Sequence, residues 1–386
     1  MTSSVLAIQS TRVIGKTGMI LLVFLVSCST MISLPLDKVA MLGVLGLLLF
    51  HQIFQNKSFS ANSLFPIIGV ASYFLLPYLL NLPDSSLIIF FPVLGLFFAS
   101  LVSEEEGFLD IIYWAIFIHI VAGILFVFSS YLVGYNIYVH PMYDKGLPFL
   151  HAAKGFTTTV QSFGTLLISW FLIFYWKKES GILTRLDSIA YWIAILGLIL
   201  TFNRNTMVVF YIILFFRHRR IFITTVVLAI VFYLYYFEFI NKLIFNVSTL
   251  NSRADLLQAF RISFFEYSAW KEYLFGHGNN MVDEVIARTT IYRTGYIENG
   301  TSVLLYTYGF IGYVAYLAAV FMFSTLLFIR KKVFYAAMFF YIFLLAQQFT
   351  HEFYATTLYL MISVFLIILN SKSPNATKGC VFPPAE

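Results

Sequence analysis

Residues 108–133 read FLDIIYWAIFIHIVAGILFVFSSYLV, and this stretch decides the fold class. Apolar side chains would cover every face of a helix built from it, whereas a barrel strand would alternate apolar and polar residues. The stretch exceeds the roughly 20 residues that an α-helix needs to cross the apolar core of a bilayer. Runs 18–34 and 221–240 have the same character. The pattern therefore predicts membrane-spanning α-helices.

The composition extends this prediction to the whole chain. Of the 386 residues, 60% are hydrophobic and 11% are charged, against roughly 25% charged in a typical soluble domain. Backbone groups in lipid must be satisfied within a helix. We therefore predict an all-α fold, in which residues 1–370 form one polytopic membrane domain and residues 371–386 a disordered cytoplasmic tail. The first apolar run is expected to be a retained anchor, because no small-residue cleavage site follows it. The predicted spans, about twelve, are 17–34, 38–55, 62–81, 86–102, 108–133, 156–176, 188–202, 206–216, 221–240, 300–328, 333–349 and 354–370.

Lysine and arginine residues predict the orientation of the bundle, because cytoplasmic loops carry an excess of them. With the N-terminus inside, fourteen basic residues fall on the cytoplasmic side. Outside the long polar loop, the opposite side receives Lys38, Lys145, Lys154 and Arg204. We therefore expect both termini in the cytoplasm. The net charge of +6 follows this sidedness and predicts no nucleic-acid surface.

Arg204 lies between two short apolar runs. One layout treats 188–216 as a single span, which would leave an unpaired arginine near the middle of the membrane at high cost. We prefer two short segments that meet at the outer surface. A guanidinium held there can bind a phosphate bidentately, whereas the alternative is an interfacial arginine that snorkels to lipid headgroups. We favour the phosphate-binding interpretation.

The segment 241–298 has a soluble-like composition and is predicted to be a large loop on the outer side. Ser252 and Asp255 are spaced as a capping box, with Arg253 in the first turn. An amphipathic helix would follow and lie on the membrane interface. Its N-terminal N–H groups and Arg253 would form an anion site, although ordinary solvated charges are the alternative. The apolar face is predicted to comprise Leu256, Leu257, Phe260, Phe264 and Tyr267, with Arg261 on the same helix.

Three further groups fall on the same side. Gly276-His277-Gly278 is a flexible turn where backbone can approach a ligand, or simply a turn that ends a helix. Glu298-Asn299 stands at the mouth of the next span, where a partly desolvated carboxylate suits a general base for a sugar hydroxyl. The alternative for Glu298 is an acid that complements the helix dipole. His351-Glu352 precedes the last span and either helps to bind substrate or caps the helix.

The core from 188 to 328 resembles the superfamily of bacterial O-antigen polymerases and O-antigen ligases, which are integral inner-membrane glycosyltransferases of the GT-C type. The matching features occur in the same order as in the family. They are an arginine after a short apolar run (Phe202-Asn203-Arg204), an Arg-led amphipathic helix that ends in Leu274-Phe275-Gly276-His277-Gly278, and a span that opens with Asn299 and contains Gly309-Phe310-Ile311-Gly312.

The resemblance implies transfer of a glycan from undecaprenyl diphosphate on the periplasmic face, with no cofactor and no metal. Arg204 and Arg253 would neutralise the leaving diphosphate, and Glu298 would be the base. The implied partners are undecaprenyl-diphosphate-linked oligosaccharides and the lipid bilayer, and a chain-length regulator is left open. By position, further substrate contacts would come from Asn205, Arg261, His277, Asn299 and His351.

Several alternatives stay open at this point. Ligases of the superfamily commonly have His-Asn where this chain has Glu298-Asn299, and this departure favours a polymerase. A lipid-linked oligosaccharide flippase or other transporter would place charged residues around a central cavity, whereas here they gather on one face. A receptor or scaffold would need neither arginine. His119, within a predicted span, is interpreted as a hydrogen-bonded bundle histidine rather than a proton site.

Overall fold

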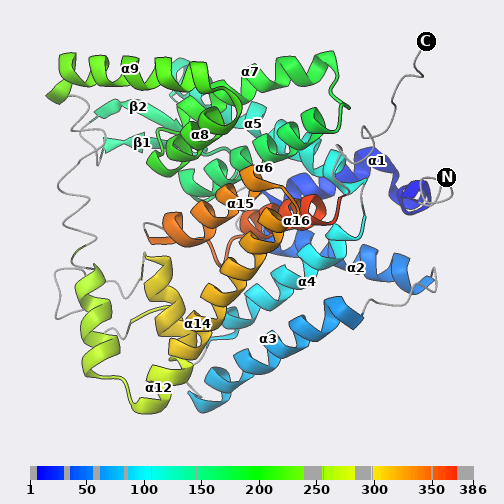
Figure 1. Cartoon of the computed structure of the whole chain (residues 1–386), viewed down its shortest axis with the longest axis vertical. Coiled ribbons are helices and arrows are strands. Elements are labelled where there is room, and N and C mark those ends of the chain that lie inside the picture. Colours follow the sequence, from blue (N-terminus) through cyan, green and yellow to red (C-terminus); the bar gives the residue numbers. More distant parts are fainter. Residues whose placement is uncertain are drawn as a thin grey trace, which may run out of the picture.

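The computed structural model describes residues 7–29, 35–54, 61–81, 86–105, 107–134, 136–143, 147–238, 254, 256–282, 297, 299–348 and 351–371, and this part of the chain is mostly helical (Figure 1). The elements are α1 (Ala7–Val26), α2 (Leu36–Phe54), α3 (Ala61–Leu80), η1 (Leu87–Phe90), α4 (Phe91–Ser103), α5 (Phe108–Val133), β1 (Val139–Met142), β2 (Leu147–Ala153), α6 (Val160–Glu179), α7 (Arg185–Leu200), α8 (Arg204–Arg217), α9 (Arg219–Tyr235), η3 (Ile262–Glu266), α12 (Trp270–Phe275), α14 (Gly300–Ile329), α15 (Val333–Phe340), η4 (Tyr341–Leu345), η5 (Ala346–Gln348) and α16 (Thr356–Asn370).

A helix lies within each of the ranges predicted as spans, but the predicted number of spans is not confirmed. Within the described residues, two helices are both long and apolar enough to cross a membrane, Phe108–Val133 and Gly300–Ile329. Other apolar helices, such as Thr356–Asn370, are shorter. Between the predicted spans 108–133 and 156–176, the structure contains an antiparallel hairpin of β1 and β2, which was not predicted from the sequence.

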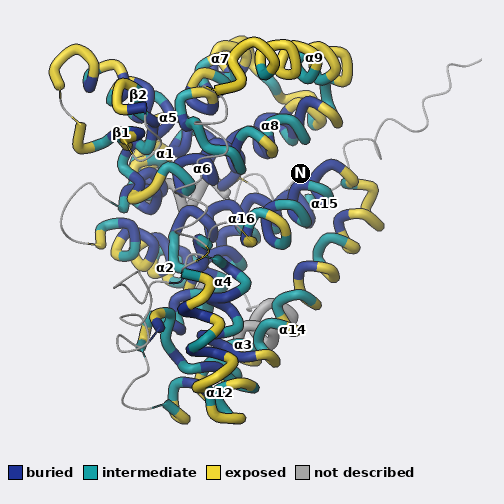
Figure 2. The backbone as a smooth tube through the Cα atoms, turned by 90° about the vertical axis from the view of Figure 1, so that its left-hand side faces the viewer, coloured by how far each residue is buried: buried dark blue, intermediate teal, exposed yellow. Residues whose placement is uncertain are grey.

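Helix α6 runs through the centre of the bundle (Figure 2). Fifteen of its twenty residues are buried, because its apolar side chains face α5, α7, α8 and α16 in turn. Gly164 lets α8 approach closely, since a Cβ atom at this position would lie 2.2 Å from Oγ1 of Thr206. The helix is about 30 Å long at a rise of 1.5 Å per residue, so its two ends are well separated.

The chain breaks between α7 and α8 at the position where the sequence predicts two short segments. Phe202 has a φ of 47°, which a helix cannot accommodate. Asn203 then caps α8, because its side-chain oxygen accepts a hydrogen bond from the N–H of Asn205 at 2.9 Å. The predicted break between two helical segments is therefore confirmed.

The C-terminal end of α6 is surrounded by ion pairs, and we call this region the charged end. Here the start of α7 and the end of α8 both return to α6, so α7 and α8 form a hairpin whose turn lies at the opposite end, which we call the pocket end. The ion pairs at the charged end are Lys16–Asp110, Lys177–Asp110, Lys177–Asp187 and Arg217–Glu179.

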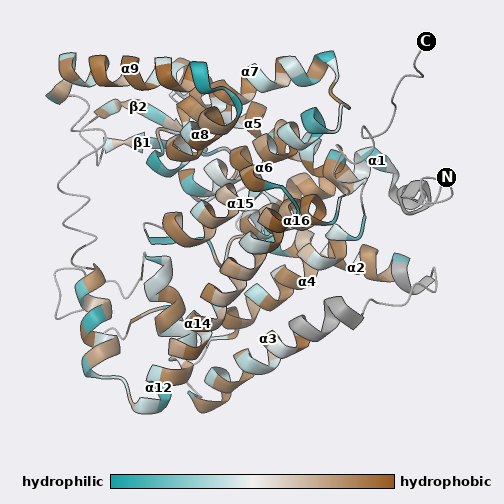
Figure 3. Cartoon of the chain, viewed as in Figure 1, coloured by the Kyte–Doolittle hydropathy of each residue, from teal (hydrophilic) through white to brown (hydrophobic). Residues whose placement is uncertain are grey.

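Helix α9 consists mostly of exposed residues (Figure 2) that are hydrophobic (Figure 3). None of its residues is buried, and Val227, Leu228 and Leu234 are 54%, 60% and 71% exposed. Exposed apolar surface of this extent is uncommon in soluble monomers and marks contact with a membrane or a partner. It supports membrane association together with the two long apolar helices.

His119 is fully buried on α5 and hydrogen-bonded at both ring nitrogens. The N–H of Phe156 donates to Nε2 at 3.0 Å, so Nδ1 carries the proton and donates to Oγ of Ser27 at 2.8 Å. Ser27 in turn donates to the carbonyl of Phe24 at 2.6 Å. The interpretation of His119 as a hydrogen-bonded bundle histidine is confirmed.

Candidate functional site

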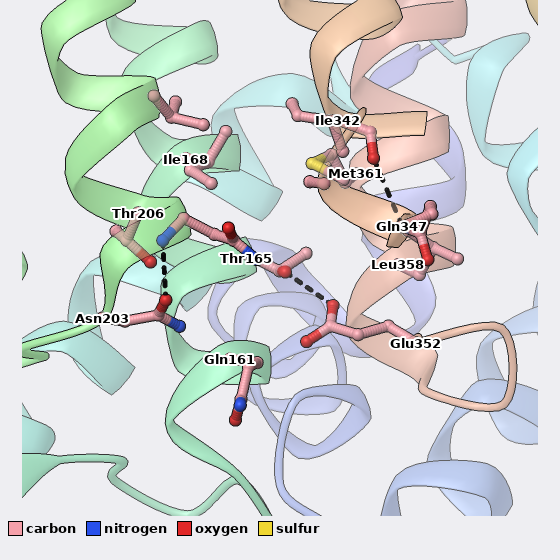
Figure 4. A pocket seen from close by; sticks show the side chains of 13 residues that line it. Gln161, Thr165, Ile168, Asn203, Thr206, Ile342, Gln347, Glu352, Leu358 and Met361 are labelled. Carbon is pink, nitrogen blue, oxygen red and sulfur yellow. Dashed lines mark hydrogen bonds between the residues drawn. The ribbon is translucent and has the colours of Figure 1, made fainter. Parts of the chain in front are cut away.

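A polar pocket opens at the pocket end, between the N-terminal ends of α6 and α8 and the segment that joins η4 to α16 (Figure 4). Its volume is about 40 Å³, and roughly 10–15 Å³ suffices for one water molecule. It can therefore hold a small polar group such as a hydroxyl. The polar side chains that line it are Gln161, Thr165, Asn203, Asn205, Thr206, Gln347 and Glu352.

Glu352 is the charged residue of this pocket. Its side chain is buried, and Oε2 accepts a hydrogen bond from the Thr165 hydroxyl at 2.6 Å. Burial disfavours the carboxylate and raises the pKa of Glu352 from 4.5 to about 6, while the hydroxyls of Thr165 and Ser162 lower it in part. A carboxyl group with a pKa near neutrality can exchange a proton at physiological pH.

Two oxygen atoms in the wall of the pocket accept no hydrogen bond of normal distance and angle from the described residues. They are Oε1 of Glu352 and Oε1 of Gln347, and both are buried. A buried acceptor without a donor carries a desolvation cost that a bound hydroxyl would remove. Figure 4 shows the Glu352 carboxyl group turned toward the side of the pocket formed by Gln161 and Asn203. The pocket is therefore complementary to a ligand that donates hydrogen bonds, such as a sugar hydroxyl.

Arg204 is placed beside this pocket. It is the first residue of α8, half-buried, and both of its chain neighbours, Asn203 and Asn205, line the pocket. The N-terminus of a helix carries partial positive charge and N–H groups suited to an anion. Arg204, the residue predicted to bind phosphate, and the buried carboxyl group of Glu352 are thus at the same end of the bundle.

Asn299 and His351 lie next to the same region. The Asn299 side chain caps α14 by accepting from the N–H of Ser302 at 3.0 Å, and it donates to the carbonyl of Gln348. Burial lowers the pKa of His351 to about 4, although a hydrogen bond with the backbone of Ile297 opposes this shift. His351 is therefore neutral at physiological pH. Both predicted substrate-binding residues border the pocket-forming segment, and for Asn299 the contacts show a capping role.

The remaining predicted site residues either lie outside the described residues or do not line the pocket. Arg253, Glu298 and the Ser252–Asp255 capping box lie outside the described residues. Arg261 is exposed and does not line the pocket.

The predicted amphipathic helix is helical over 256–261 and continues as η3. Its predicted apolar face is divided. Phe260 and Phe264 stack at 5.5 Å and are buried within the protein, while Leu257 and Tyr267 are 42% and 69% exposed.

The Gly276-His277-Gly278 turn packs against protein. Gly276 and Gly309 both have positive φ values, and a Cβ on Gly276 would lie 2.2 Å from the carbonyl oxygen of Thr307. His277 stacks on Tyr306 at 4.2 Å and bonds Ser268 through Nε2 at 2.7 Å. The close approach that the glycines permit is thus made by the kinked backbone of α14. Figure 1 places α12, which His277 follows, at the far end of the long axis from α8, so the structure does not bring His277 and Arg204 together.

Sequence reasoning singled out Arg204 and Asn205 but not Glu352 as a candidate acid or base. The available signal was its position beside His351 ahead of a span, which also suits a helix cap. No group of three or more histidine, cysteine or acidic side chains suited to a metal ion occurs in the described ranges.

Replacing Thr165 by valine is expected to raise the pKa of Glu352 by about 1, because a hydrogen bond that favours the carboxylate is lost. Infrared spectra taken across a pH series would follow the C=O band of protonated Glu352, which is identified by its absence in Glu352→Gln. Ser169→Ala is the matched control, since its hydroxyl bonds the backbone carbonyl of Thr165 at 2.7 Å and not Glu352. An unchanged pKa in Thr165→Val would contradict the assigned role of the threonine.

No protein-family model, curated protein or solved structure matches this chain.

Proposed function

We propose that this protein is an O-antigen polymerase, a membrane glycosyltransferase that joins surface-polysaccharide repeat units at the periplasmic face. It transfers a growing glycan from undecaprenyl diphosphate to the non-reducing-end hydroxyl of a repeat unit that is itself linked to undecaprenyl diphosphate. One observation carries the proposal: a buried carboxyl oxygen that lacks a donor, in Glu352, shares a pocket with the asparagines on either side of Arg204. The acceptor hydroxyl needs a carboxylate that can take its proton, and the anionic leaving group needs a positive charge such as that of Arg204.

The proposal places the chain in the bacterial inner membrane as a multi-pass protein with both termini in the cytoplasm. The charged end would face the cytoplasm and the pocket end the periplasm. The distribution of basic residues supports this orientation, because Lys16, Lys177, Arg217 and Lys332 all belong to the charged end. The exposed apolar side chains of α9 would then contact lipid.

In the proposed reaction, the acceptor hydroxyl donates its proton to Glu352 as its oxygen attacks C1 of the donor sugar. The bond between C1 and the phosphate oxygen breaks, and undecaprenyl diphosphate leaves with the bonding electron pair. A direct displacement inverts the configuration at C1. Arg204 and the N-terminus of α8 stabilise the negative charge that develops on the diphosphate, which is the step where fixed positive groups contribute most. Arg253 remains the predicted second cation. The resemblance implies Glu298 as the base; because Glu298 lies outside the described residues, the proposal assigns this role to Glu352.

The ligase alternative uses the same diphosphate chemistry with lipid A core as the acceptor. A flippase or transporter would instead need ionisable groups around a central path. In the described part of the chain, the ion pairs gather at the charged end and the interior His119 is committed to Ser27 and Phe156. These contacts favour a glycosyltransferase.

Deletion of the gene in the source bacterium separates the candidates. A polymerase loss leaves lipopolysaccharide with core plus one repeat unit, a ligase loss leaves bare core, and a flippase loss leaves repeat units unexposed at the periplasm. Silver-stained gels read the first two outcomes. Purified protein supplied with undecaprenyl-diphosphate-linked repeat units should also build a ladder of longer glycans. Absence of the ladder, or bare core in the deletion strain, would exclude the polymerase.

A further inference from the structure

A second cavity, of about 420 Å³, lies at the charged end. It is bounded by the C-terminal ends of α6, α8 and α16 and by the turn between α14 and α15. The volume falls within the range of about 300–1,000 Å³ that is typical of small-molecule sites. The proposed reaction does not use it, because it sits at the opposite ends of the helices that form the polar pocket.

The charges of the lining residues favour an anion. Arg217, Lys331 and Lys332 contribute three positive charges and Glu179 contributes one negative charge, which leaves a net charge of +2 from the lining residues. Positive charge concentrated in a recess attracts an anion more strongly than the same charge on a flat surface. Such a recess between membrane helices at the cytoplasmic side is suited to a lipid head group.

The cationic groups are held in place by their neighbours. The guanidinium of Arg217 lies over the Phe334 ring at 4.2 Å and near the Tyr175 ring at 5.4 Å, and it pairs with Glu179. The Tyr335 hydroxyl donates to the other oxygen of Glu179 at 3.1 Å. A ligand would therefore meet a prearranged guanidinium.

Lys332 and Lys331 differ in their contacts and in their exposure. Lys332 donates to carbonyl oxygens at the end of α16, including that of Ser371 at 2.7 Å. Burial and the nearby Arg330 lower the pKa of Lys332. Lys331 is exposed at the rim of the cavity, so its charge can be removed without disturbing the end of α16.

One side of the cavity is apolar and reaches the outer surface of the bundle. Phe216 and Val333 line it and are 38% and 44% exposed, and Phe215, beside Phe216, is 46% exposed. Trp176 adds an aromatic wall with a polar N–H group. A small soluble anion would make no apolar contact with this side, whereas a phospholipid has both a charged head group and an apolar body.

We propose that this cavity binds the phosphate head group of an anionic phospholipid from the cytoplasmic leaflet. Arg217, Lys331 and Lys332 contribute the positive potential for the phosphate, and the glycerol and upper acyl region lies against Phe216 and Val333. The site goes beyond the proposed function, because it requires membrane placement but no glycosyl transfer. Loss of lipid binding and loss of polymerase activity are therefore separate results.

The test measures the thermal stability of the purified full-length protein in detergent during titration with phosphatidylglycerol or phosphatidylcholine. Phosphatidylglycerol should raise the melting temperature in a saturable way, and phosphatidylcholine should not. Lys331→Gln should weaken the apparent affinity about fivefold, because one positive charge near the phosphate is lost. Arg217→Gln should weaken it further, and comparison of its melting temperature without lipid shows whether it folds.

Lys178→Gln is the matched control, since Lys178 is an exposed lysine at the same end of α6 that does not line the cavity. Its phosphatidylglycerol titration should match that of the unaltered protein. Equal weakening in Lys178→Gln and Lys331→Gln, or equal stabilisation by both lipids, would overturn the proposal. Stabilisation by inorganic phosphate alone, at the concentrations where phosphatidylglycerol acts, would assign the cavity to a soluble phosphate and overturn the lipid site.

Discussion

Replacing Arg204 by alanine is expected to reduce glycan polymerisation by about 100-fold or more while the protein still inserts into the membrane. The magnitude corresponds to the loss of one fixed positive donor to a developing anion, which typically costs about 3–4 kcal/mol of transition-state stabilisation. The helix should survive, because Asn203 rather than Arg204 caps α8. The measurement is the rate of ladder formation by purified protein, normalised to the amount of folded protein.

Two further variants make the Arg204 result specific. Arg204→Lys keeps the charge but loses the bidentate geometry, so it should restore part of the activity. Arg219→Ala removes an arginine at the start of α9, away from the pocket, and should leave the rate unchanged. Glycans of normal length from Arg204→Ala at normal protein levels would remove the basis of the proposed diphosphate site.

Glu352→Gln should abolish polymerisation and, above pH 6, make the protein more stable. Glutamine keeps the shape of the side chain but cannot accept the proton of the attacking hydroxyl. Because burial raises the pKa of Glu352 from 4.5 to about 6, the folded state resists ionisation of this group. Its stability is then highest below pH 4.5 and decreases as the pH rises through 6. The charged form costs about 2 kcal/mol, which follows from 1.36 kcal/mol for each pKa unit.

Thermal melting at pH 5 and pH 8 would measure this effect. The stabilisation by Glu352→Gln should be larger at pH 8, where Glu352 is ionised in the unaltered protein. The activity of the unaltered protein should rise with pH up to about 6 as Glu352 loses its proton. Glu238→Gln, which changes an exposed carboxylate at the end of α9, should alter neither property. A Glu352→Gln variant that polymerises normally would reduce Glu352 to a structural group.

Much of the helical arrangement could be predicted from the sequence because each helix is set by a local run of apolar residues. Residues 108–133 predict the bounds of α5 directly, and the polar residues at 203–205 predict the break before α8. The β1–β2 hairpin was missed because its short strands carry no clear alternation of apolar and polar residues. Its burial depends on contacts with α5 and α7 that lie elsewhere in the chain.

The candidate site was harder to predict because its chemistry depends on contacts between distant segments. Glu352 acquires its environment from Thr165, which is 187 residues away along the chain, and no local pattern records that contact. His277 shows the reverse case. Its glycine neighbours correctly indicate a close backbone approach, but the sequence does not say that α14 rather than a ligand makes it.

Helices α6 and α9 should differ in the substitutions that they tolerate. Fifteen residues of α6 are enclosed by neighbours, so each side chain there must match a shape fixed by several others, and few exchanges will be tolerated. Helix α9 has no buried residue. Leucine, isoleucine, valine and phenylalanine should replace one another along it with little effect, since no buried position on this helix imposes a shape on its side chains. Within one chain, α6 is constrained in the identity of its residues and α9 only in their average polarity.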